Sequence, residues 1–327
     1  MTRHFLPLLL ALLPVAGTAC GKAGTDGAGG SGRLAVAVIP KGTTHVFWKA
    51  VERGAREAGE ELGVEVLWKG PLVENDRAQQ IQLLQQFTSQ KVAGIALAPL
   101  DHAARACFTG PASAAGIPVV VFDSALDGMA PRDFASTVST DNEKAGRLAG
   151  EALAERIAPD PKAGAKVVLL RYMVGSASTE SRESGFLEAV KARPTVEVLV
   201  QNRYAGATAG EAKSEALNLA DALAKATGVF CPNESSTMGM LLALRQLGLA
   251  GKIRFVGFDA SPPLLEALRA GEIDALVVQD PRRMGNLAVR TLVAAIRKQP
   301  VEPAIDTGAT LVTKEDLEKP EIRALLE

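Results

Sequence analysis

The chain has 327 residues, with 36 lysines and arginines against 37 aspartates and glutamates, and a formal net charge of −1. This length leaves room for two domains, and the balanced charge excludes the broad positive field typical of nucleic-acid-binding proteins. Only three cysteines are present, and no group of His, Cys, Asp or Glu has metal-ligand spacing. We therefore expect no metal and no cofactor. The pattern favours Cys107 and Cys231 as buried thiols, and a disulfide between them stays open as the alternative.

The first 19 residues predict an export signal. A short basic start precedes an apolar run from Phe5 to Ala16, which is too short to span a bilayer. Small residues follow, and Cys20 then stands where a bacterial lipoprotein is lipidated, although Gly17 occupies the usual leucine position. The alternative is ordinary cleavage after Ala19. Residues 20–33 are rich in Gly and predict a flexible tether. We expect a periplasmic or cell-envelope protein whose only membrane contact is a lipid anchor at Cys20.

Short apolar runs alternate with helical stretches along the rest of the chain. The predicted strands form two series of five: Leu34–Ile39, Val64–Leu67, Gly94–Ala98, Pro118–Phe122 and Thr137–Ser139, then Lys166–Arg171, Val196–Val200, Gly228–Phe230, Ile253–Phe258 and Ala275–Val278. Nearly continuous Val, Ile, Leu and Ala is typical of parallel strands that are covered on both faces. The sequence therefore predicts an α/β fold with two Rossmann-like lobes and parallel sheets.

The helix expected after the first strand carries one apolar stripe. Its residues recur at intervals of three or four: Phe47, Val51, Ala55, Ala58 and Leu62. Trp48 lies one position away from the stripe and points elsewhere on the helix. This pattern favours a core position for Phe47 and a ligand contact for Trp48.

Polar residues follow nearly every predicted strand. Ligands of open parallel sheets bind beyond the carboxyl ends of the strands, so these residues are candidates for one common cleft. Carboxylates, amides and arginine bind hydroxyl groups, and aromatic rings cover the C–H faces of sugar rings. Structural roles remain open for several of them: a helix cap for Asp141 and Asn142, a solvated turn for Lys41, and a charged surface loop for Lys69, Glu74 and Asp76. A cleft position for Tyr204 is likewise open.

The chain resembles the periplasmic sugar-binding proteins of ABC transporters, within their ribose-binding-like type I group. The resemblance covers about residues 34–312 and rests on the order and spacing of several segments, among them GIALAPLD, VSTDNEKAGRLAGE, FCPNESSTMGML and VGFDASPPLLEAL. It implies two lobes joined by a three-crossing hinge near Thr140, Gln279 and Asp306. The N-terminal lobe would be 34–140 with 280–305, and the C-terminal lobe 141–279 with 306–327.

The resemblance also implies which residues contact the ligand. By position they are Thr44 or His45, Phe47, Trp48, Asp123, Ser124, Arg182, Asn233, Asp259 and Gln279. Two departures bear on the ligand: Ser124 replaces an arginine of the ribose binders, and Lys41 adds a cation near the cleft, where we expect it to bind ligand. A hexose, an inositol-like polyol or another polyhydroxylated compound fits these residues as well as ribose does.

We interpret the chain as a monomeric solute-binding protein that delivers a sugar or polyol to an ABC permease. The alternative is a sensor module for a chemoreceptor or histidine kinase. An enzyme is disfavoured, because no G-x-S-x-G, P-loop or dinucleotide-binding glycine motif follows a predicted strand. A repressor core of the lactose-repressor type, which shares this fold, is disfavoured by the export signal and by the missing DNA-binding helices.

Overall fold

A computed structural model describes residues 33–157 and 164–326. The predicted export signal, Cys20 and nearly all of the predicted tether lie outside the described residues. None of the helices in the described part of the chain has the length and apolar character needed to cross a membrane.

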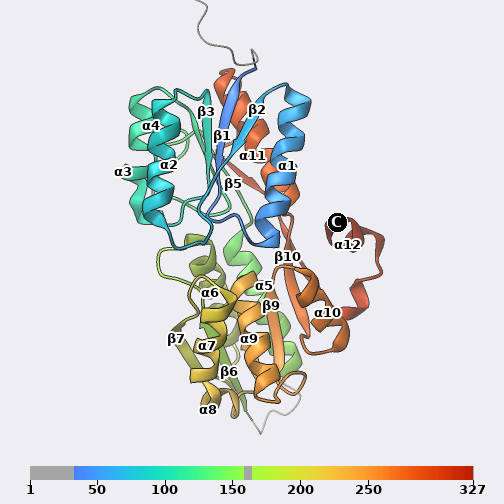
Figure 1. The fold of residues 1–327 in the computed structure, drawn as a ribbon. Helices are drawn as coiled ribbons and strands as arrows, with labels where there is room; N and C mark the ends of the chain where they lie inside the picture. Colours follow the sequence, from blue (N-terminus) through green and yellow to red (C-terminus); the bar gives the residue numbers. More distant parts are fainter. Residues whose placement is uncertain (1–32, 158–163, 327) are drawn as a thin grey trace, which may run out of the picture. The chain divides into compact units, whose positions relative to one another are not determined.

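The strands form two six-stranded sheets, one in each of two lobes (Figure 1). In spatial order, the sheet of the N-lobe contains β11 (Ala304–Asp306), β5 (Ser136–Ser139), β4 (Val119–Phe122), β3 (Gly94–Leu97), β1 (Ala35–Ile39) and β2 (Glu65–Trp68). The sheet of the C-lobe contains β12 (Ala309–Val312), β10 (Ala275–Gln279), β9 (Arg254–Phe258), β8 (Gly228–Phe230), β6 (Ala165–Arg171) and β7 (Val196–Tyr204). Every pairing is parallel except that of β10 with β12. The predicted two-lobed α/β fold is confirmed.

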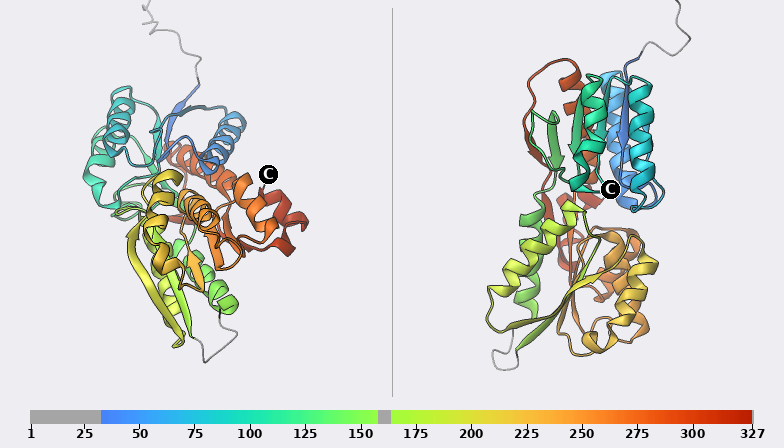
Figure 2. Two further views of the ribbon diagram at one scale, coloured as in Figure 1. Left: turned by 60° about the horizontal axis from the view of Figure 1, so that its bottom comes forward. Right: turned by 90° about the vertical axis from the view of Figure 1, so that its left-hand side faces the viewer.

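Helices cover both faces of each sheet (Figure 2). Those of the N-lobe are α1 (Val46–Leu62), α2 (Arg77–Ser89), α3 (Arg105–Phe108), α4 (Gly110–Ala114) and α11 (Pro281–Ile296). Those of the C-lobe are α5 (Asn142–Ile157), α6 (Ala177–Lys191), α7 (Ala209–Asn218), α8 (Ala220–Leu223), α9 (Glu234–Gln246), α10 (Pro262–Ala270) and α12 (Pro320–Leu326).

Strand β1 shows how this layering follows from the sequence. Val36 and Val38 pack into the core beneath α1 and α11, whereas Ala37 and Ile39 pack beneath α2, α3 and α4. Because successive strand side chains point to opposite faces, a strand that is buried on both sides needs an unbroken apolar run.

Three pairs of helices approach each other closely through glycine. In the N-lobe, a Cβ atom on Gly54 of α1 would overlap the carbonyl oxygen of Arg282, and one on Gly285 of α11 would overlap that of Val51. The C-lobe repeats the arrangement: Gly146 of α5 faces the backbone of Arg182 in α6. The C-lobe also contains a third pair, in which Gly239 of α9 faces the backbone of Ala209 and Lys213 in α7. Both lobes are thus stiffened by helices with backbones in direct contact.

Three segments connect the lobes, at Thr140–Asp141, at Asp280 and at Thr307–Gly308. They are bonded to one another: Thr140 Oγ1 donates to Gln279 Oε1 (2.9 Å), and the Asp141 amide donates to Asp306 Oδ1 (3.0 Å). This arrangement turns the carboxyl ends of the strands in both sheets toward the space between the lobes.

Outside that space the structure corrects the expected burial of Cys107 and places Tyr204, whose position was open. Cys107 is exposed, because α3 is a single turn that buries only Phe108; Cys231 is buried. Strand β7 extends to Tyr204, whose ring is 40% exposed and lies against the guanidinium of Arg171 (5.6 Å). Tyr204 therefore lies on the surface of the C-lobe.

Candidate functional site

Side chains from the carboxyl ends of both sheets surround one cavity between the lobes. The space left open among them is small, about 30 Å³, because side chains of the two lobes bond to each other across it. The N-lobe contributes Lys41, His45, Phe47, Trp48, Glu74 and Asp123. The C-lobe and its connection contribute Tyr172, Ser176, Ser178, Thr179, Arg182, Asn233, Glu234, Asp259 and Gln279.

Most of the residues predicted to contact a ligand lie on this wall: Lys41, His45, Phe47, Trp48, Asp123, Arg182, Asn233, Asp259 and Gln279. Two do not. Thr44 is exposed, and its hydroxyl donates to the Leu72 carbonyl (3.1 Å). Ser124 is buried at the junction of the lobes, where its hydroxyl accepts the Ser178 amide (3.1 Å).

The two aspartates of the wall are held by equivalent backbone turns. Asp123 follows β4 and Asp259 follows β9, with φ angles of +62° and +67°. This left-handed conformation is uncommon outside glycine, although aspartate tolerates it better than most residues. In both, the amide still donates to the neighbouring strand, to Val138 and Val277 respectively. The turn therefore aims each carboxylate into the cavity without breaking the sheet.

Arg182 is the central cation on the C-lobe side. It is 2% exposed, and its guanidinium donates to Asn142 Oδ1 (2.8 Å), the Pro232 carbonyl (3.0 Å) and Gln279 Oε1 (2.7 Å). The group also lies 4.1 Å from the centre of the Phe258 ring. Burial lowers the pKa of this guanidinium from its usual value. Five N–H groups with three protein acceptors leave donors for a ligand.

A chain of bonds fixes the remaining polar atoms of the C-lobe wall. Gln279 Nε2 donates to Asp259 Oδ1 (2.8 Å), and the Glu234 amide donates to Asp259 Oδ2 (2.9 Å). Burial raises the pKa of Asp259 to about 6. Asn233 caps α9 through the Ser236 amide (3.2 Å) while lining the cavity, so the capping and site roles coincide in one residue.

The aromatic pair of α1 is placed differently from the prediction. Trp48, only 2% exposed, belongs to the core cluster beneath α1 and also lines the cavity; Phe47 is half-buried beside it. Their ring centres are 4.9 Å apart with planes at 86°. The buried stripe begins at Trp48 and continues through Val51 and Ala55, which also fits helical spacing.

Lys41 is buried rather than solvated. Its exposed fraction is 3%, and Nζ lies 2.9 Å from Asp123 Oδ2. The same ammonium donates across the cavity to the hydroxyls of Ser178 (3.0 Å) and Ser176 (3.4 Å). All three of its protons therefore have protein partners, and Lys41 ties the two lobes together while lining the cavity.

Glu74 is the main residue that sequence reasoning missed. It follows β2 in a polar segment that suggested a surface loop, yet it is 7% exposed. Its Oε1 accepts Trp48 Nε1 (2.8 Å) and lies 2.7 Å from His45 Nδ1. Burial lowers the pKa of His45, but the bond and charge of Glu74 outweigh it and raise that pKa to about 9. The same ion pair holds the pKa of Glu74 below its usual value against the opposing effect of burial.

The ion pair of His45 and Glu74 predicts a loss of stability in mild alkali. A histidine with a pKa of 6.5 when unfolded and about 9 when folded stabilises the fold fully below pH 6.5. That contribution, at most ~3 kcal/mol, disappears as the pH rises through about 9. Thermal melts at pH 7 and pH 9.5 should show a drop for the wild type and a smaller drop for His45→Asn. Equal drops would contradict the assignment.

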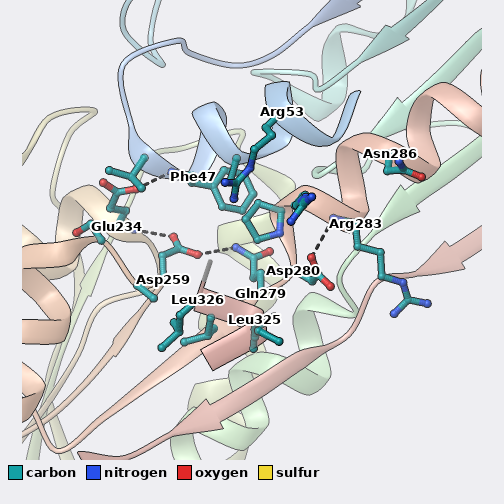
Figure 3. Close-up of a pocket in the computed structure, with 18 of the residues that line it drawn as sticks. Phe47, Arg53, Glu234, Asp259, Gln279, Asp280, Arg283, Asn286, Leu325 and Leu326 are labelled. Atoms are coloured by element: carbon teal, nitrogen blue, oxygen red, sulfur yellow. Dashed lines mark hydrogen bonds between the residues drawn. The ribbon is translucent and has the colours of Figure 1, made fainter. Parts of the chain in front are cut away.

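A larger cavity adjoins the first and shares its wall. Glu234, Asp259 and Gln279 line both spaces, and Figure 3 shows them in the larger one together with Leu325 and Leu326 of α12. In this outer space Arg282 is paired with Glu57 (2.9 Å), and Asp280 accepts the amide of Arg283 at the start of α11 (2.9 Å). The buried, ligand-facing donors and acceptors line the inner cavity, which is therefore the candidate site.

No group of three or more His, Cys, Asp or Glu within residues 33–157 and 164–326 is arranged to hold a metal ion. The candidate site is thus a set of hydrogen-bonding groups and aromatic rings between two lobes. Such a set suits an uncharged ligand that carries many hydroxyls.

A family model described as a periplasmic binding protein domain matches residues 36–300. The chain belongs to the periplasmic binding proteins. Membership in this family implies an extracytoplasmic location, as the sequence predicted.

Several relatives of this periplasmic binding protein are known. The D-allose-binding periplasmic protein of Escherichia coli K12 is 27% identical over 271 residues, covering 82% of this chain and 86% of the relative. A sugar-transport periplasmic component from Hahella chejuensis superposes with a TM-score of 0.81 at 36% identity, over 85% of this chain and 99% of that one. A carbohydrate-transporter solute-binding protein from Agrobacterium radiobacter, in complex with D-arabinose, gives 0.84 at 33% identity, over 91% and 100%.

Proposed function

We propose that this protein captures a sugar or related polyol between its lobes and delivers it to an ABC permease. The observation that carries the proposal is the inner cavity, where acceptors and donors from both sheets converge beside Phe47 and Trp48. In this structure these groups bond to one another across the cavity, and the hydroxyls of a sugar would replace those partners when the ligand enters.

Relatives support transport over sensing. The two solved neighbours are named as components of sugar or carbohydrate transport, and a further relative, from Haemophilus influenzae, is named a ribose import binding protein. A permease is accordingly the partner that we propose, and the proposed role is binding and delivery without catalysis. The divergence at Lys41 and Ser124 leads us to propose a monosaccharide or polyol without favouring ribose.

Closure of the lobes around the ligand is the proposed capture step. Loops of the two lobes are already hydrogen-bonded to each other. Arg77 Nη2 donates to the Val174 carbonyl (2.7 Å), and the His102 amide donates to the Gly175 carbonyl (3.1 Å). A ligand that contacts both walls favours the closed form over the open one, because it gains contacts that only closure provides.

We further propose that the protein acts as a monomer held at the membrane by a lipid on Cys20. The proposal rests on the lipoprotein-like signal and on the Gly-rich stretch after it. Mass spectrometry of the N-terminus of the mature protein distinguishes a lipidated Cys20 from a free cysteine produced by cleavage after Ala19.

A thermal-shift screen against pentoses, hexoses and polyols tests the ligand class. A ligand that binds only the folded state raises the melting temperature. We expect at least one monosaccharide or polyol to do so in the wild type and not in Asp259→Ala, which removes a buried acceptor of the wall. Stabilisation of Asp259→Ala equal to that of the wild type would place the ligand elsewhere, and the absence of any stabilising sugar or polyol would refute the ligand class.

A further inference from the structure

Glu74 joins three side chains of the inner cavity that come from both lobes. On the N-lobe side, Oε1 is bonded to the Trp48 indole and the His45 imidazole. On the C-lobe side, Oε2 accepts the hydroxyl of Tyr172 at 3.0 Å. One oxygen thus faces two predicted ligand contacts and the other faces the opposite lobe.

Each partner of this carboxylate is held firmly in its own lobe. Tyr172 is 1% exposed, and its amide donates to Glu183 Oε1 (2.9 Å), whose other oxygen accepts from Arg171. In the N-lobe, Gly42 lies in the turn between β1 and α1, and a Cβ atom there would be only 2.8 Å from Cγ of Glu74. The absence of a side chain at Gly42 therefore leaves space for Glu74. The Glu74–Tyr172 bond therefore joins two rigid bodies and requires the lobes to be closed.

The protonation states suit a strong bond between these two groups. The pKa of Glu74 is lowered, so the carboxylate is ionised and only accepts; burial raises the pKa of Tyr172 well above its usual value, so its hydroxyl stays a donor. Hydrogen bonds to an ionised acceptor are about twice as strong as neutral ones.

We propose that Glu74 is a positioning residue that couples ligand contact in the N-lobe to lobe closure, with its bond to Tyr172 setting how long the ligand stays bound. The proposal rests on the proposed function, because it concerns the same cavity. A ligand that orients His45 and Trp48 holds Glu74 in the position that Tyr172 needs. The free energy of that bond is available only in the closed form, so it shifts the equilibrium toward closure.

The test removes one oxygen atom with Tyr172→Phe. Tyr204→Phe is the matched control, because Tyr204 is the only other tyrosine of the chain and lies outside the cavity. Stopped-flow measurements with D-arabinose and D-allose would give association and dissociation rates. We expect Tyr172→Phe to raise the dissociation rate about tenfold with little change in the association rate, and Tyr204→Phe to change neither. Equal dissociation rates in both variants would overturn the proposal even if the melting temperature of Tyr172→Phe fell.

Small-angle X-ray scattering of the sugar-free protein gives a second readout. We expect a larger radius of gyration for Tyr172→Phe and for Glu74→Gln than for Tyr204→Phe, because the closed form loses a bond. If neither sugar binds the wild type, the kinetics are measured with the most stabilising ligand of the thermal-shift screen. If that screen yields none, the proposed ligand class fails, and the scattering comparison alone tests the coupling. Identical radii in the three variants would then reject the coupling.

Discussion

Replacing Arg182 with methionine is expected to weaken sugar binding by about 30-fold or more, or ~2 kcal/mol. Methionine keeps much of the volume but removes the donor to Asn142 and to the Pro232 carbonyl, and one of the two donors to Gln279 Oε1. Losing one partner of a buried, charged network costs more than the bond itself, because the other partners stay desolvated. Calorimetry with the most stabilising sugar of the thermal-shift screen measures the effect.

Two further variants serve as comparisons for Arg182→Met, one that keeps the charge and one at an exposed arginine. Arg182→Lys keeps the charge but cannot reach three acceptors in different directions, so we expect it to recover only part of the affinity. Arg193→Met changes an exposed arginine in the turn after α6 and should leave binding unchanged. An affinity for Arg182→Met within twofold of the wild type would remove Arg182 from the site.

A methyl group at Gly54 is expected to lower the free energy of unfolding by about 2 kcal/mol or more. The added Cβ would overlap the backbone carbonyl of Arg282, which no change of side-chain rotamer relieves. The two helices must then separate, which loosens the core that they cover. Denaturant unfolding of Gly54→Ala measures the loss.

Gly110→Ala is the matched control for this substitution. A Cβ atom at Gly110 in α4 would meet no atom within 4 Å, so alanine there is expected to be neutral or slightly stabilising. Equal stabilities for the two variants would show that α1 and α11 tolerate separation.

The strands could be predicted from the sequence because both faces of each sheet are buried, which requires continuous apolar runs. Ten strands stand out as apolar runs, and all ten are present within a few residues of the predicted bounds. The edge strands β11 and β12 were missed, since they are short and half-exposed and carry no such run. The start of the α1 stripe was misplaced because Phe47 and Trp48 lie four and three positions before Val51, and both spacings fit a helix.

The residues of the inner cavity were predictable where they directly follow a strand. Asp123, Asp259 and Gln279 occupy positions that the geometry of a parallel sheet brings to one edge. Glu74 and Tyr172 have no such signal: one lies in a loop of mixed polar residues, and the other continues an apolar strand. Their role depends on the hydrogen bond that they form between the lobes, and the two residues are 98 positions apart along the chain.

The path of the chain through the lobes sets the order in which they can fold. The five parallel strands of the C-lobe come from one continuous stretch, residues 165–279, and can pair as soon as that stretch is available. The N-lobe needs α11 to cover α1, and the ion pair of Glu57 with Arg282 joins positions 225 residues apart. Closing so long a loop is slow. We expect the C-lobe to fold first, although β1 of the N-lobe precedes it in the sequence. The apolar side of α1 would stay uncovered until α11, near the C-terminal end, can pack against it.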